Sequence, residues 1–113
     1  MSSMILDGAI KKVSKDNVIS VLKKLVSIPS MTGMEREISE YIFNTLSDWG
    51  ISVQKSWVDK KRFNVVARIG TREKTHSLMF NGHVDTVYPE TSEESFEPKI
   101  VGNKLYGFGS VDM

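Results

Sequence analysis

The chain has 113 residues, of which 40% are hydrophobic, and it carries a net charge of +1 and no cysteine. This length and composition support one domain with a packed core, and the lack of cysteine excludes a disulfide scaffold, a thiolate metal site and a cysteine nucleophile. The near-balanced charge gives no reason to expect a nucleic acid or a membrane as a partner, and no apolar run exceeds three residues, whereas a membrane-spanning helix needs about 20.

The chain begins with an unpatterned segment that is followed by a short amphipathic helix. Residues 1–15 lack the basic and apolar regions of a secretory signal, so we expect a cytoplasmic protein. Asp16 is the expected N-cap of a helix over 16–27. Pro29 ends this helix, because the residue before a proline avoids helical backbone angles. The apolar face of the helix consists of Val18, Val21, Leu22 and Leu25.

A longer helix is predicted over 34–49. Thr32 and Glu35 fit a capping box, in which each side chain accepts a hydrogen bond from a backbone N–H at the start of the helix. Gly50 follows the last turn and suits the left-handed position that ends many helices. The apolar face of this helix consists of Ile38, Tyr41, Ile42, Leu46 and Trp49.

The rest of the chain has the pattern of strands and turns. Alternating apolar residues predict strands over 51–57 and 63–69, which we expect to pair as a hairpin. The apolar run within 77–81 predicts a buried central strand. The acidic segment 88–98 is typical of a loop, and the Gly-Asn pair at 102–103 predicts a two-residue hairpin turn. Helices and strands in this order indicate an α/β fold.

One of the two histidines occupies a position that favours a ligand site. His76 lies in a polar linker and is expected to be exposed. His83 follows the predicted strand 77–81 through Gly82, and ligand sites of α/β sheets collect at the carboxyl ends of strands. Asp85 points the same way as His83 in an extended segment, so its carboxylate is placed to accept a hydrogen bond from the imidazole and to orient a metal-bound ring. Taken alone, this His-x-Asp pair is a weak signal and is more typical of a surface turn than of a metal site.

A third candidate for chemistry is Asp112, close to the end of the chain. Gly107 and Gly109 precede it, and two glycines before a carboxylate indicate a tight backbone path that aims the side chain. The segment is neither a dinucleotide fingerprint nor a phosphate loop, because the required third glycine and the Gly-Lys-Ser or Gly-Lys-Thr triplet are missing. The alternative is a solvated aspartate at the end of the chain.

Several other residues are more typical of structural roles. Trp49 and Trp57 are expected in the core, and the basic run 60–62 is expected at a solvated hairpin tip. The acidic loop lacks the ligand spacing of a calcium site, so its glutamates are expected at the surface. These glutamates are Glu90, Glu93, Glu94 and Glu97.

Motifs that are weak singly become specific in combination. They occur in order at 28–30 (Ile-Pro-Ser), 32–35, 64–67, 80–87, 96–98 and 102–113. The combination resembles the zinc metallopeptidase and amidohydrolase family that includes acetylornithine deacetylase, succinyl-diaminopimelate desuccinylase, aminoacylase and the glutamate carboxypeptidases. The most specific parts are Gly-His-Val-Asp-Thr-Val at 82–87 and the closing segment 105–113.

This resemblance implies a two-metal hydrolase. His83 is then a ligand of one metal ion, Asp112 bridges two ions, and Asp85 is the acidic catalytic residue that orients His83. The ions are expected to be zinc, with cobalt or manganese as alternatives. The implied substrate is a small N-acyl amino acid or a peptide, and the implied fold is part of a three-layer α/β/α sandwich. Residues 1–113 are expected to be the N-terminal part of the metal-binding catalytic domain.

The same resemblance implies that parts of the site are missing from this chain. The family's general base, its remaining metal ligands and its second domain, which acts as a lid and can mediate a homodimer, match nothing in 1–113. Phe108 stands where the family often has arginine. We therefore expect a truncated hydrolase that is inactive as an isolated chain. A non-catalytic α/β binding module with a family-like sequence is the alternative, and nothing separates deacylase from exopeptidase.

Overall fold

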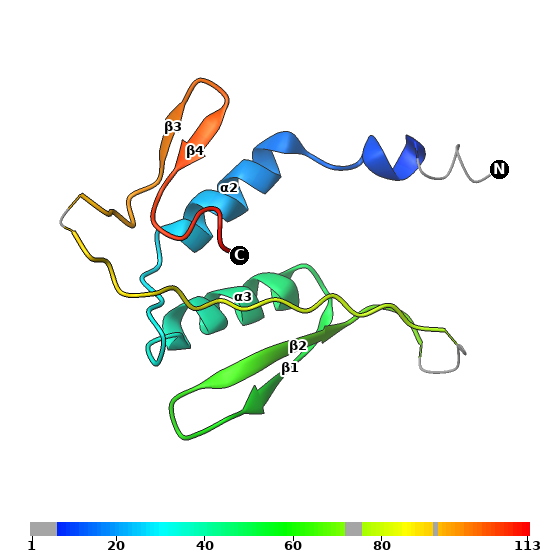
Figure 1. Ribbon diagram of the computed structural model, residues 1–113. Helices are drawn as coiled ribbons and strands as arrows, with labels where there is room; N and C mark the ends of the chain where they lie inside the picture. Colours follow the sequence, from blue (N-terminus) through cyan, green and yellow to red (C-terminus); the bar gives the residue numbers. More distant parts are fainter. Residues whose placement is uncertain (1–6, 72–75, 92) are drawn as a thin grey trace.

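The computed structural model describes residues 7–71, 76–91 and 93–113. The expectations for 1–6, for 72–75 of the polar linker and for Ser92 of the acidic loop lie outside the described residues. Figure 1 shows helices and β-hairpins along the chain, with a further short helical turn at residues 7–10. The elements are α2 (Lys15–Val26), α3 (Arg36–Asp48), β1 (Ser52–Trp57), β2 (Phe63–Arg68), β3 (Lys99–Val101) and β4 (Lys104–Tyr106). No helix combines the length and the apolar character that crossing a membrane requires, within the described part of the chain.

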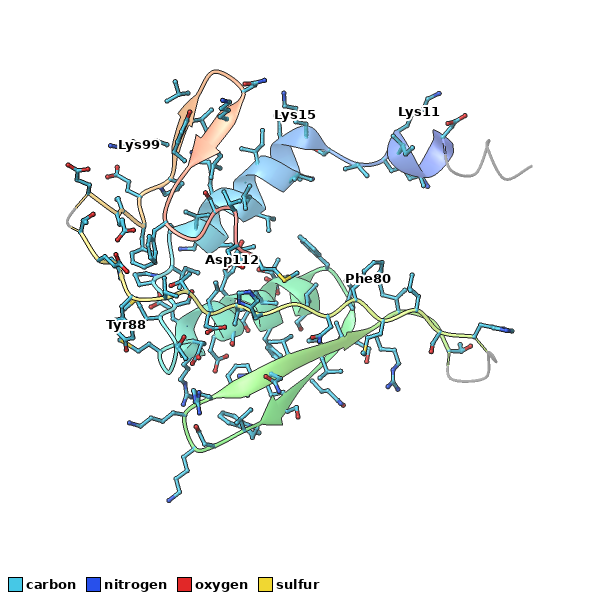
Figure 2. All side chains as sticks on the ribbon, in the orientation of Figure 1. Lys11, Lys15, Phe80, Tyr88, Lys99 and Asp112 are labelled. Atoms are coloured by element: carbon cyan, nitrogen blue, oxygen red, sulfur yellow. The ribbon has the colours of Figure 1, made fainter. Side chains whose placement is uncertain are left out.

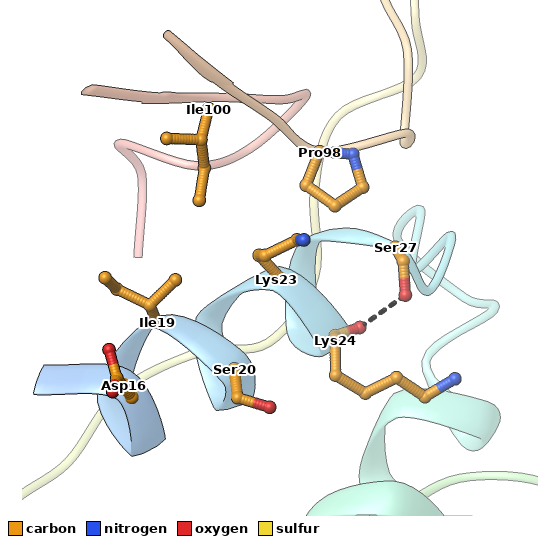
Figure 3. A pocket seen from close by; sticks show the side chains of 8 residues that line it. All are labelled: Asp16, Ile19, Ser20, Lys23, Lys24, Ser27, Pro98 and Ile100. Carbon is orange, nitrogen blue, oxygen red and sulfur yellow. Dashed lines mark hydrogen bonds between the residues drawn. The ribbon is translucent and has the colours of Figure 1, made fainter. Parts of the chain in front are cut away.

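Helix α2 begins earlier than its sequence predicts. Its N-cap is Ser14, which has extended backbone angles and whose hydroxyl accepts a hydrogen bond from the Asn17 N–H at 3.3 Å. The prediction of Asp16 as the cap is wrong. Asp16 lies within the first turn, where its negative charge still suits the positive end of the helix. At the other end, the Ser27 hydroxyl donates to the Lys24 carbonyl at 2.8 Å (Figure 3).

Helix α3 lacks the predicted capping box. Its N-cap is Glu35, which makes no side-chain bond to the start of the helix. The Glu35 carboxylate instead accepts a hydrogen bond from the Gly33 N–H at 2.8 Å, and the Thr32 hydroxyl donates to Asp85 at 2.7 Å. Each side chain therefore has a different partner from the one that local sequence predicts, and the helix begins at Arg36.

The C-terminal end of α3 follows the prediction. Gly50 has a φ of +75°, a value that strongly favours glycine. Its N–H donates to the Ser47 carbonyl, and the Ile51 N–H donates to the Leu46 carbonyl at 3.1 Å. These two bonds form a Schellman motif, which turns the chain directly into β1.

Strands β1 and β2 form the predicted antiparallel hairpin, which packs on α3 (Figure 1). Lys55 of β1 links the hairpin to the helix: its ammonium group lies 2.6 Å from the Glu40 carboxylate. The same group lies 4.7 Å from the ring centre of Phe43 and 4.6 Å from that of Phe63. A cation held between a carboxylate and two aromatic faces fixes the orientation of this hairpin.

The core is small, and it excludes both tryptophans. Trp49 is 60% exposed and Trp57 is 53% exposed, so the prediction that they lie in the core is wrong. Trp57 contacts the Phe63 ring, at 5.0 Å between centroids, and the Arg36 guanidinium lies 5.7 Å from its ring centre, but half of its surface stays open. The buried apolar residues are Val26, Ile28, Ile38 and Phe63.

The predicted buried strand at 77–81 is wrong. In Figure 1 this segment (yellow-green) runs past α3 and β2, and it has no strand partner among the described residues. Leu78, Met79 and Phe80 are 80%, 83% and 90% exposed. The radius of gyration is 16.6 Å, whereas a compact chain of this length has about 13 Å. A large apolar surface is therefore uncovered, and the fold is α/β in content without a closed sandwich.

Strands β3 and β4 form the predicted second hairpin, turning at 102–103 with Gly102 at a φ of +62°. The hairpin faces α2 across a shallow hollow (Figure 3). This hollow is lined by Asp16, Ile19, Ser20, Lys23, Lys24, Ser27, Pro98 and Ile100.

Candidate metal centre

Two distant segments of the chain meet in a short parallel bridge beneath the site. The Thr32 N–H donates to the Thr86 carbonyl at 3.0 Å, and the Thr86 N–H donates to the Ser30 carbonyl at 2.9 Å. Ser30 is only 2% exposed. The bridge therefore holds the segment before α3 against the segment that carries His83 and Asp85.

The glycines of the closing segment allow it to approach this bridge. A Cβ on Gly109, whose φ is +74°, would lie 2.7 Å from the Cγ2 of Thr86. A Cβ on Gly107 would lie 2.3 Å from the Cγ1 of Val26. Only glycine fits such close approaches. The backbone path brings Asp112 beside the segment that runs from Phe80 to Tyr88 (Figure 2).

The three predicted site residues come together around the imidazole of His83. Its Nε2 lies 3.2 Å from Oδ1 of Asp112. Its Nδ1 lies 3.1 Å from the backbone carbonyl of Asp85 and 3.3 Å from Oδ1 of the same residue. Each ring nitrogen thus faces a different aspartate. The orientation expected from the His-x-Asp spacing, with the Asp85 carboxylate on one side of the ring, is present in the structure.

A fourth residue belongs to this group. The Thr32 hydroxyl donates to Oδ2 of Asp85 at 2.7 Å, and so occupies the carboxylate oxygen that does not face His83. Local sequence predicts a different role for Thr32, as half of a capping box. Local sequence patterns cannot predict the contact between Thr32 and Asp85, because the two residues are 53 positions apart in the chain.

Hydrogen bonds shift the pKa values of two of these groups. The backbone carbonyl of Asp85, followed by the Asp112 carboxylate, raises the pKa of His83. The Thr32 hydroxyl is the main cause that lowers the pKa of Asp85. Both shifts favour the charged forms of the two groups, the imidazolium of His83 and the carboxylate of Asp85.

The donor atoms fit part of a metal coordination sphere. Two ligands of a tetrahedral zinc ion with bonds of about 2.0–2.1 Å lie about 3.3 Å apart. The Nε2 of His83 and Oδ1 of Asp112 are 3.2 Å apart, while the Nδ1 of the same ring is directed at Asp85. Across residues 7–71, 76–91 and 93–113 the structure has no cluster of three or more side chains able to hold an ion.

An apolar hollow adjoins the carboxylates. Its volume is about 190 Å³, and Asp85 and Asp112 lie on its wall. The apolar part of the lining comes from α2, α3, the closing segment and the loops between them: Leu22, Leu25, Val26, Ile28, Ile38, Ile42, Val84, Phe96, Phe108 and Met113. A low-polarity wall strengthens electrostatic interactions at the carboxylates.

The other histidine, His76, is exposed, as predicted. It lies seven positions before His83, at the start of the extended segment and outside the group formed by His83, Asp85 and Asp112.

Comparison with known proteins shows similarity to several hydrolases. The chain is 35% identical over 101 residues to a peptidase M20 domain-containing protein of Schizosaccharomyces pombe, covering 86% of this chain and 24% of that protein. It is 38% identical over 103 residues to a LysW-lysine/LysW-ornithine hydrolase of Pyrococcus abyssi, covering 89% of this chain and 27% of that protein. It is 33% identical over 102 residues to a succinyl-diaminopimelate desuccinylase of Ehrlichia canis, covering 84% of this chain and 26% of that protein.

The chain thus spans about a quarter of the length of these curated relatives. No family model matches the chain, and no solved structure matches it.

Proposed function

Since this chain corresponds to a segment of the M20 peptidase family, we propose that it supplies one part of the active site of a metal-dependent hydrolase. The reaction is cleavage of an amide bond in a small N-acyl amino acid or a peptide. The observation that carries this proposal is the imidazole of His83 between two aspartates, with Nδ1 facing Asp85 and Nε2 lying 3.2 Å from Asp112.

The residues have distinct roles in this proposal. Nε2 of His83 and the carboxylate of Asp112 would hold metal, and the 91% exposure of the Asp112 side chain leaves room for a second ion. Asp85 accepts a hydrogen bond from the Nδ1–H at its backbone carbonyl, its carboxylate faces the same nitrogen, and Nε2 so stays available as a ligand. Zinc, or cobalt or manganese in its place, would supply Lewis-acid chemistry at these residues when bound: polarisation of a carbonyl and a lower pKa of water.

The chain is proposed to be the N-terminal part of a catalytic domain with a three-layer α/β/α sandwich. Helix α3 packed on the β1–β2 hairpin supports this, and so does the uncovered apolar surface at Leu78, Met79 and Phe80. Other parts of the longer hydrolase are proposed to supply the general base, the remaining ligands and the second domain.

Zinc binding by the 113-residue chain tests the proposed ligands. Calorimetry should give weak binding by the wild type, since two side chains are fewer than the three that zinc sites usually have. His83→Ala and Asp112→Ala should each remove it, and His76→Ala should leave it unchanged. Equal binding by the wild type and the His83→Ala variant would contradict the proposal.

A further inference from the structure

Thr32 makes a contact that its predicted capping role does not explain. Its hydroxyl has one proton, and that proton is directed at Oδ2 of Asp85 at 2.7 Å. The carbonyl of Thr86 lies 3.4 Å from the same hydroxyl and is the weaker acceptor. A short bond from a hydroxyl to a carboxylate is charge-assisted, so the Asp85 contact dominates.

The backbone holds Thr32 in the position that this bond requires. Hydrogen bonds from the Thr32 N–H to Thr86 and from the Thr86 N–H to Ser30 lock the two segments in register, directly beside Asp85. A β-branched side chain has few rotamers, so the hydroxyl has few alternative directions at this backbone position.

The effect of this bond reaches His83 through the carboxylate. The Nδ1 of His83 has a hydrogen bond with the backbone carbonyl of Asp85 at 3.1 Å, and the carboxylate adds a second contact: with Oδ2 held by the hydroxyl, Oδ1 remains 3.3 Å from Nδ1. Rotation of the carboxylate would break both contacts at once. We propose that Thr32 is a positioning residue of the site: its hydroxyl fixes the Asp85 carboxylate and thereby keeps the Nδ1–H tautomer of His83, with Nε2 aimed toward Asp112. The part of this inference that concerns metal rests on the proposed function.

Imidazole nitrogen spectra of the metal-free chain test the positioning role. The spectra are recorded on the ¹⁵N-labelled 113-residue chain at one alkaline pH, and each variant is compared with the wild type. Thr32→Val keeps the branched shape and removes the hydroxyl, so the Nδ1–H population of His83 should fall. Thr32→Ser restores the hydroxyl and should restore the wild-type spectrum. Thr91→Val, at an exposed threonine of the acidic loop, is the matched control and should change nothing.

An unchanged His83 spectrum in a folded Thr32→Val chain would overturn the inference. A second measurement covers the case in which this variant does not fold. Three-bond couplings should show one side-chain rotamer for Thr32 in the wild type and averaged rotamers in Asp85→Ala. Averaged rotamers in the wild type would overturn the inference as well.

Zinc titration separates this inference from the proposed function. Loss of an orienting partner typically weakens metal binding by about 10–100-fold, so Thr32→Val should raise the zinc dissociation constant by that factor, and Thr32→Ser should have a much smaller effect. If the wild type bound no zinc while the imidazole spectra still responded to Thr32→Val, the metal site would fail and the positioning role would stand. If zinc bound and the spectra did not respond, the positioning role would fail and the metal site would stand.

Discussion

The Nε2 of His83 lies 3.2 Å from Oδ1 of Asp112, although 29 positions separate the two residues in the chain. This contact depends on the close passage of the closing segment over Thr86 and α2, where Gly107 and Gly109 leave no room for a side chain. The site is thus assembled by backbone packing as much as by the side chains that form it.

Gly109→Ala should displace Asp112 from His83. The new Cβ would lie 2.7 Å from Thr86 at a φ of +74°, so it combines a steric clash with backbone strain. Gly102→Ala is the matched control, because its φ is +62° but its Cβ would meet nothing within 4 Å. The control should lower the free energy of unfolding by about 1–2 kcal/mol from backbone strain alone, and Gly109→Ala should lower it by more. Thermal unfolding measures both, and equal losses would contradict the close approach.

Asp112→Ala should abolish amide hydrolysis in the longer hydrolase that we propose contains this chain. The variant removes the carboxylate proposed to be shared by both ions. Asp48→Ala, at the exposed end of α3, should retain activity. Assay after chelation and controlled return of zinc distinguishes a lost ligand from lost zinc. Full activity in the Asp112→Ala enzyme would end the bridging hypothesis.

The isolated 113-residue chain should hydrolyse no N-acyl amino acid, even with added zinc. His83 and Asp112 supply two ligands, and a catalytic zinc normally has three protein ligands with one open position. A general base must also come within about 2.6–3.2 Å of the proton that it removes, and no residue here matches the family's base. The test is an acylase assay beside the zinc titration. Turnover that disappears in Asp112→Ala would show that the chain completes a site unaided.

Lowering the pH should weaken the tip of the β1–β2 hairpin. The Asp59 carboxylate accepts bonds from the Lys61 N–H, the Arg62 N–H and the Arg62 guanidinium, at 2.7, 2.8 and 2.8 Å. These bonds, led by the one from Lys61, lower the pKa of Asp59 from 3.8 to about 2. Because the folded pKa is the lower one, the stabilisation is complete above pH 3.8 and is lost as the pH falls toward 2.

Asp59→Asn provides the comparison for this pH dependence. Urea unfolding should show the wild type more stable than the variant near neutral pH, with the difference closing below about pH 4 as Asp59 takes up its proton. A difference that stays constant from neutral pH to the acid limit would mean that Asp59 contributes through its shape and not through its charge.

Phe80→Glu should make the chain less prone to self-association. Phe80 is 90% exposed in an extended segment without a strand partner among the described residues, next to two further exposed apolar residues. Unpaired, apolar extended segments favour edge-to-edge association. Sedimentation should show association of the wild type that Phe80→Glu reduces, while Ile10→Glu, at a 60% exposed residue elsewhere, should have a smaller effect. A wild type that stays monomeric at high concentration would refute this expectation.

Elements that depend on neighbouring residues can be predicted from the sequence. Both hairpins follow from alternation and turn chemistry within a few positions, and the end of α3 follows from Gly50. The grouping of His83 with Asp85 is equally local, because two residues that are two positions apart in an extended segment share a direction. The two glycines before Asp112 indicate its close approach in the same way.

Features that depend on distant partners cannot be predicted in this way. The segment 77–81 has the composition of a buried strand, but a strand also needs neighbours to bond, and the described chain provides none. The burial expected for Trp49 and Trp57 likewise requires a covering layer. Spacing places Thr32 in a helix cap because Glu35 is three residues away, whereas its partner in the structure, Asp85, is far away in the sequence.

The short link between His83 and Asp112 also has an entropic meaning. An ion bound by both side chains would close a loop over the 29 positions that separate them, which include the acidic loop and the β3–β4 hairpin. Closing a loop of that length costs about 3 kcal/mol in chain entropy, and the ion would offset that cost each time it binds. The ordering of the last quarter of the chain would then follow the concentration of metal around it.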